Sequence, residues 1–92
     1  DYTYECLKRY FNETIQLKKP SGGLAIWIEF QPSISLIQLA EEVSKLDVLL
    51  PKTILYQDKN TCAIRFGFGH LNEEEIEIVV SKLKLAYNSI IK

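Results

Sequence analysis

The sequence has 92 residues, which is room for one domain and not for two. Hydrophobic residues make up 47% of it and charged residues 25%, which excludes a disordered tail, a collagen-like chain and a low-complexity linker. Eleven basic residues face twelve acidic ones, and only two of the basic residues are arginines, so the dense positive surface of a nucleic-acid-binding domain is excluded as well.

Cysteine and methionine usage indicates a cytoplasmic protein and a chain taken from a longer one. Cys6 and Cys62 have neither metal-ligand spacing nor the pattern of a disulfide framework, so we expect two reduced thiols. The longest apolar run covers residues 24–28 and no signal peptide opens the chain, so no membrane segment is expected. Because the chain starts at Asp1 and contains no methionine, we expect residues 1–92 to be a single domain of a longer protein.

A helix is predicted over residues 1–12, because apolar side chains recur there at spacings of three and four. These side chains are Tyr4, Leu7, Tyr10 and Phe11. Ile15 and Leu17 alternate with polar residues in the next stretch, and residues 19–23 (KPSGG) break the pattern as a turn.

Residues 24–30 form the strongest predicted strand, and residues 61–68 form the second. Strict alternation divides each of them into two faces. One face carries Leu24, Ile26, Ile28 and Phe30 together with Cys62, Ile64, Phe66 and Phe68. The other face carries Ala25, Trp27, Glu29, Ala63, Arg65 and Gly67.

A helix is predicted after the first of these strands. Ser35 is its N-cap, and Gln38 completes a capping box. The apolar stripe of this helix, about three turns long, consists of Leu36, Leu39, Ala40, Val43 and Leu46. Residues 48–50 are then predicted as a short buried strand that Pro51 ends, and residues 53–56 as a further short extended piece.

The last helix is predicted to begin after Asn72, with Glu75 at its third position as the partner in a capping box. The acidic residues 73–75 lie at the positive N-terminal end of the helix dipole, which explains them without a metal site. The inner stripe of this helix consists of Ile76, Val79, Val80, Leu83, Tyr87 and Ile90.

These elements predict an α+β fold, a two-layer sandwich in which three helices cover one face of a small, mainly antiparallel sheet. No helix remains for the other face, on which Trp27 and Arg65 stand among small residues. We therefore expect a missing domain or a ligand to lie against this face.

Arg65 is the strongest candidate for a functional residue. Its guanidinium can donate two parallel hydrogen bonds to a carboxylate, in a geometry that lysine cannot copy. Ala63 and Gly67, two positions away on the same face, leave space for a ligand above the strand. A solvated arginine on a sheet surface is the alternative.

The other residues with chemical potential fit structural roles. Gly22 and Gly23 are not followed by a helix, so they lack the helix N-terminal amides that cradle a phosphate. His70, the one histidine, has no nucleophile motif beside it. No lysine stands in a setting that indicates a Schiff base, and neither a metal nor a catalytic residue is expected in this chain.

Four segments, in their order and spacing, resemble a known family. They are PSGGLAIWI (20–28), VLLP (48–51), AIRFGFG (63–69) and NEEEI (72–76). They resemble the C-terminal small domain of fold-type I pyridoxal-phosphate (PLP) aminotransferases, and most of all the MocR branch of the GntR-family transcription regulators. Members of that branch carry an N-terminal winged helix-turn-helix fused to an aminotransferase-like domain. The resemblance spans residues 4–90.

The resemblance implies that Arg65 binds the α-carboxylate of an amino-acid substrate or effector. PLP and its lysine would belong to a large domain outside this chain, so the chain alone would hold no cofactor and would be no enzyme. DNA would be bound only by an absent N-terminal domain, and the parent protein would be a homodimer. A genuine PLP-dependent aminotransferase is the alternative, and a free-standing amino-acid-binding or interaction module is a second alternative.

Overall fold

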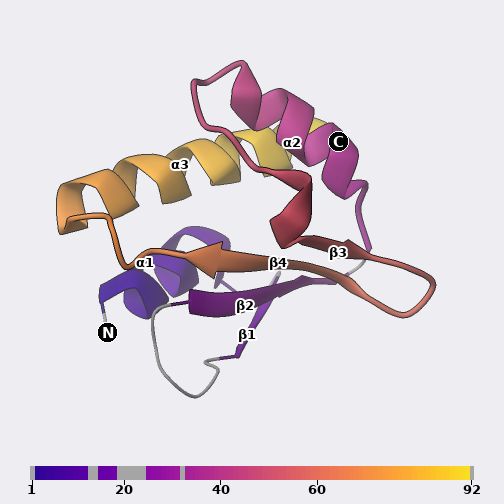
Figure 1. Ribbon diagram of the computed structural model, residues 1–92, viewed down its shortest axis with the longest axis horizontal. Helices are drawn as coiled ribbons and strands as arrows, with labels where there is room; N and C mark the ends of the chain where they lie inside the picture. Colours follow the sequence, from indigo (N-terminus) through magenta and orange to yellow (C-terminus); the bar gives the residue numbers. More distant parts are fainter. Residues whose placement is uncertain (1, 13–14, 19–24, 32, 92) are drawn as a thin grey trace.

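The computed structural model describes residues 2–12, 15–18, 25–31 and 33–91, and in these residues it has three α-helices, four strands and one 3₁₀ turn (Figure 1). In chain order they are α1 (Tyr2–Phe11), β1 (Ile15–Lys18), β2 (Ala25–Phe30), α2 (Leu36–Ser44), the 3₁₀ turn η2 (Lys52–Ile54), β3 (Leu55–Gln57), β4 (Cys62–Gly67) and α3 (Glu73–Ile90). The sheet has the order β1-β2-β4-β3, and all neighbouring strands run antiparallel. The predicted α+β architecture is confirmed.

The two central strands, β2 and β4, have the two faces that their alternating sequences predict. In their register Ile28 pairs with Ile64 and Trp27 with Arg65. Directly paired residues of antiparallel strands point to the same side of the sheet. The two isoleucines are fully buried, whereas Arg65 is exposed. The sheet therefore has one apolar face and one face of mixed character.

The helices form one layer over the apolar face, as predicted, and α3 lies between α1 and α2 and contacts both (Figure 1). An aromatic cluster joins the layer to the sheet. The ring of Phe11 on α1 lies 5.5 Å from that of Tyr87 on α3 and 6.2 Å from that of Phe30 on β2. Phe30 and Tyr87 stack at 5.6 Å. Three elements that are distant in the sequence thus share one packing centre.

The two predicted N-caps differ in the structure. Asn72 and Glu75 form both halves of a capping box at the start of α3. Ser35 accepts a hydrogen bond from the backbone N–H of Gln38 at 3.2 Å, but the reciprocal bond from the Gln38 side chain does not form. Gln57 on β3 caps a further backbone group of the helix: its Oε1 accepts a hydrogen bond from the backbone N–H of Leu36 at 2.9 Å. This side chain ties the start of α2 to the edge of the sheet.

The predicted buried strand at residues 48–50 is wrong, because the end of α2 uses the backbone there for another purpose. Asp47 has a positive φ of 68°, and its N–H bonds to the carbonyl of Ser44. The N–H of Val48 bonds to the carbonyl of Val43. This pair of bonds is a Schellman closure, which turns the chain away from the helix axis. Leu49 is left 83% exposed, on a loop that belongs to no strand.

The remaining predicted segments are confirmed with altered bounds or lie outside the described residues. Residues 53–56 begin as the turn η2 and become extended only at β3. The predicted turn over residues 19–23 and the first strand residue, Leu24, lie outside the described part of the chain. Within that part, no helix is both long and apolar enough to cross a membrane.

Truncation of core side chains tests the layer arrangement. Ile64→Ala and Leu83→Ala each remove a buried side chain and should lower the free energy of unfolding by about 2–5 kcal/mol, measured by urea titration. Leu85→Ala is the matched control, because Leu85 lies on the same helix and is 61% exposed; its effect should stay within about 0.5 kcal/mol. Equal losses for Leu83→Ala and Leu85→Ala would contradict the assignment of the buried face.

A polar cluster joins α1 to α3 beside the aromatic packing. The carboxylate of Glu77 on α3 accepts hydrogen bonds from the hydroxyl groups of Tyr2 at 2.7 Å and Tyr10 at 2.8 Å. The guanidinium of Arg9 forms an ion pair with the same carboxylate at 2.9 Å. The hydroxyl groups of Tyr2 and Tyr10, followed by the charge of Arg9, hold the pKa of Glu77 below its usual carboxyl value.

Glu77→Gln should destabilise the fold in a pH-dependent way. The lowered folded-state pKa means that the carboxylate contributes its full stabilisation above the usual pKa of a glutamate and loses it as the pH falls through the lowered value. The difference in unfolding free energy between wild type and Glu77→Gln should therefore be largest at pH 7 and shrink in acid, measured by urea titration at several pH values. Glu41→Gln, on the exposed side of α2, serves as the control. A difference that is constant with pH would contradict the pairing.

Candidate functional site

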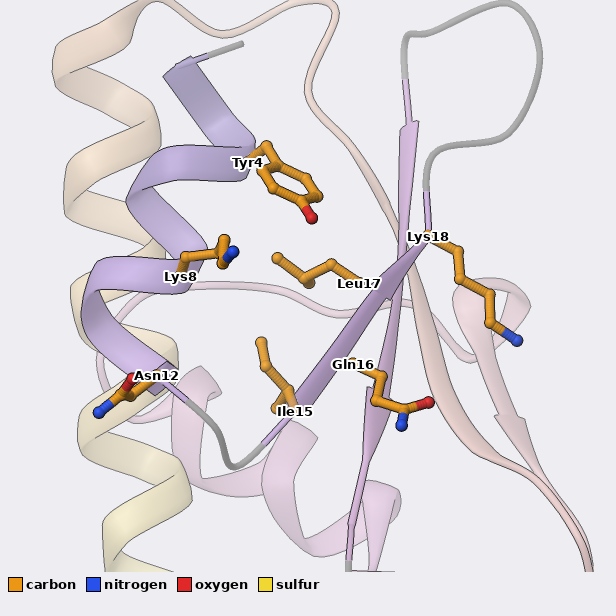
Figure 2. Close-up of a pocket in the computed structure, with 7 residues that line it drawn as sticks. All are labelled: Tyr4, Lys8, Asn12, Ile15, Gln16, Leu17 and Lys18. Carbon is orange, nitrogen blue, oxygen red and sulfur yellow. The ribbon is translucent and has the colours of Figure 1, made fainter.

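The face of the sheet away from the helices is the candidate site, and we call it the outer face. Figure 2 shows that Ile15 and Leu17 of β1 point toward α1, whereas Gln16 and Lys18 point the opposite way. The strand register then assigns to the outer face Gln16, Lys18, Ala25, Trp27, Glu29, Tyr56, Ala63, Arg65 and Gly67. No described helix covers these residues.

Arg65 lies near the middle of the outer face, on β4 and directly opposite Trp27. Lys18 on β1 and Glu29 on β2 neutralise each other, with 3.0 Å between the lysine Nζ and a carboxylate oxygen. The guanidinium of Arg65 forms no hydrogen bond or ion pair within the described ranges. Among the described outer-face residues, Arg65 is thus the one charge that is not balanced.

Two aromatic rings lie beside Arg65. Trp27 is directly opposite Arg65 on β2, and its ring centroid is 4.9 Å from that of Tyr56 on β3, with 45° between the ring planes. The two rings reach toward each other across β4, which accounts for the complete burial of Ala63 on a face without helices. Trp27 is half-buried and Tyr56 is 40% exposed, so apolar surface remains open to solvent.

Gly67, two residues after Arg65 on β4, leaves free space where a side chain would stand. A Cβ atom placed on Gly67 would meet no atom within 4 Å, and its φ lies outside the left-handed region. The glycine is therefore required neither by packing against the described chain nor by backbone conformation. It pairs with Ala25, another small residue, which is buried and only 5% exposed. Glycines in strands often mark places where a ligand or another backbone approaches closely.

The other candidate residues have structural positions. His70 is exposed in the turn between β4 and α3. Glu75 belongs to the capping box of α3. Cys6 and Cys62 are buried free thiols, and burial raises the pKa of Cys6, which makes it a poor nucleophile. Gly22 and Gly23 lie outside the described residues. The described ranges contain no group of three or more potential ligands that could hold a metal ion.

Two hollows have outer-face residues in their linings, Gln16 and Lys18 in the first and Gly67 in the second. One, of about 310 Å³, lies between α1 and β1, where Tyr4, Lys8 and Leu17 line it (Figure 2). The other, of about 500 Å³, is mostly apolar and lies between the loop after α2 and the turn after β4; Leu49 and His70 are among its lining residues. Neither contains Arg65.

The sequence predicted that Arg65, Trp27 and Gly67 share one face of the sheet, but it did not place Tyr56 there. The pairing of Tyr56 with Trp27 depends on β3 lying next to β4, and a three-residue strand has no periodicity from which this can be predicted.

No protein-family model matches the chain, and no curated protein matches it.

Gly67→Ala tests whether the fold needs this glycine. Since the added Cβ meets nothing, the free energy of unfolding should stay unchanged or rise by up to about 1 kcal/mol, measured by urea titration. Ala63→Leu, on the same strand and face, is the contrasting variant, because it must displace the ring pair above it and should cost about 1–3 kcal/mol. A clear loss of stability in Gly67→Ala would show that the fold itself uses the glycine.

Proposed function

We propose that the outer face binds the α-carboxylate of an amino acid through Arg65. The domain would act as the C-terminal small domain of an aminotransferase-like transcription regulator of the MocR type, as the sequence resemblance implies. The observation that carries the proposal is the guanidinium of Arg65, which no described charge balances, on the face that no described helix covers, between Gly67 and the rings of Trp27 and Tyr56.

Arginine suits a carboxylate better than lysine does at such a position. Its fork can donate two parallel N–H···O bonds, which fix the orientation of the ligand as well as its charge. When a ligand or another domain covers the outer face, water is excluded from the pair, and each hydrogen bond gains strength from the lower local dielectric.

The described lysines do not fit PLP. A lysine that forms an imine with an aldehyde has to be desolvated or otherwise perturbed so that it loses its proton. Each lysine in the described ranges is exposed or half-buried, and Lys18 on the outer face is paired with Glu29. The proposal therefore leaves PLP to another domain of the parent protein and assigns no step to the cofactor.

The carboxylate site serves a regulator and a genuine aminotransferase equally well. In either protein the carboxylate has to orient the amino acid before the regulator senses it or the enzyme converts it. DNA binding through an N-terminal domain and assembly of the parent into a homodimer are further parts of the proposal that rest on the sequence resemblance. The decisive test accordingly concerns the site itself.

Substitution of Arg65 in the full-length protein should weaken amino-acid binding without unfolding the domain. Arg65→Lys keeps the charge but loses the fork, so affinity should fall; Arg65→Ala should reduce it further, by about 2–5 kcal/mol once the ligand covers the pair. Isothermal titration with each of the common L-amino acids measures the affinities, and urea titration should show little change in stability, because Arg65 lies outside the core.

Lys45→Ala provides the control, because Lys45 is an exposed cation at the end of α2 in the helical layer. It should bind amino acids as the wild type does. Equal affinities in wild type, Arg65→Lys and Arg65→Ala would reject the carboxylate site and leave Arg65 as a solvated surface residue.

A further inference from the structure

The surroundings of Arg65 restrict what else the ligand can carry. Trp27 lies directly opposite Arg65, and Cβ atoms of such pairs are about 4.5–5.5 Å apart. A carboxylate held by the guanidinium therefore has its own side chain within reach of the indole ring. In the other direction Gly67 and Ala25 carry little side chain of their own: Ala25 is only 5% exposed, and Gly67 lines the mostly apolar hollow of about 500 Å³ beside the loop after α2.

We infer that the ligand is an amino acid with an aromatic side chain, which packs on the ring pair of Trp27 and Tyr56. The inference rests on the proposed carboxylate site and adds the class of ligand to it. The ring planes are tilted by 45° and the ring centroids are 4.9 Å apart, and part of this aromatic surface is exposed beside the guanidinium of Arg65. Aromatic rings prefer offset or edge-on packing against each other at such separations.

The charge distribution on the outer face favours an uncharged side chain. Lys18 and Glu29, the remaining charged residues that the register assigns to this face, already form an ion pair. An acidic or basic side chain of the ligand would meet no free opposite charge in the described part of the face. A ring contacts Trp27 and Tyr56 without needing one.

The same distribution argues against single-stranded nucleic acid, which also stacks on aromatic side chains. Proteins that bind it line a groove with positive charge along the phosphate backbone. The described outer face has a single unpaired cation, Arg65, and the whole chain has a net charge of −1. One cation fits one carboxylate.

Titration of the full-length protein with L-phenylalanine and with L-cyclohexylalanine tests the inference. The two ligands share the carboxylate and have similar apolar volume, so their difference reports the aromatic contact. L-phenylalanine should bind about two- to tenfold more tightly, which is the range that an aromatic pair contributes beyond apolar burial. Trp27→Leu should remove this preference while the affinity for L-alanine stays unchanged. Ile78→Ala, an exposed apolar residue on α3, should leave all affinities as they are.

The variants separate failure of the inference from failure of the carboxylate site. If Arg65→Ala weakens every amino acid equally but the wild type does not prefer L-phenylalanine, the carboxylate site stands and the aromatic ligand is rejected. If L-phenylalanine binds Arg65→Ala as tightly as it binds the wild type, the carboxylate site is rejected and the inference with it. Binding of an oligothymidylate that depends on both Trp27 and Tyr56 would overturn the inference in favour of a nucleic acid.

Discussion

The two faces of the sheet depend on the register between β2 and β4. Ile28 pairs with Ile64 on the helix side, and this pairing places Trp27 opposite Arg65 on the outer side. A shift by one residue would bring isoleucines into water and would carry the tryptophan and the arginine toward the core. Burial of Ile28 and Ile64 on the helix side therefore also fixes the position of the Trp27–Arg65 pair on the outer face.

The helix α3 holds the helical layer together and attaches it to the sheet. Tyr87 packs on Phe11 and Phe30, so its one ring ties α3 to both α1 and β2 through two contacts. Glu77, further toward the start of the same helix, binds three polar groups of α1. The helix layer is thus fastened by apolar and polar contacts together, and all of these contacts lie on one side of the sheet. The outer face contributes little to this fastening and is free to carry other chemistry.

The parts of the fold with a strong local pattern could be predicted from the sequence. The alternation in β2 and β4 and the Asn72 cap of α3 belong to this group, because each is decided by residues within a few positions of one another. Residues 48–50 have the composition of a strand, but the Schellman closure after α2 uses the N–H of Val48. The edge position beside β4 is occupied by β3. Residue composition alone does not show that the Schellman closure uses this backbone and that β3 takes the edge position.

The candidate site divides in the same way. Arg65 and Trp27 were predicted to share a face because each lies on a regular strand, and their direct pairing then follows from the register. Tyr56 could not be placed, since its strand is short and its contact with Trp27 crosses β4. The anchoring of α2 by Gln57 was missed for the same reason. Contacts made by short strands depend on the assembled sheet and have no local signature.

The unbalanced charge of Arg65 also limits what can cover the outer face. While the face is open, water solvates the guanidinium at no cost to the fold. A purely apolar partner would have to remove that water without replacing it, and burial of an unpaired charge costs several kcal/mol in real proteins. A partner that brings a carboxylate replaces the lost hydration with two directed hydrogen bonds. Because Glu29 is already engaged by Lys18, the chain has no described anion on this face with which to neutralise Arg65 itself. A partner that covers Arg65 without cost would therefore have to supply an anion that the described part of this face lacks.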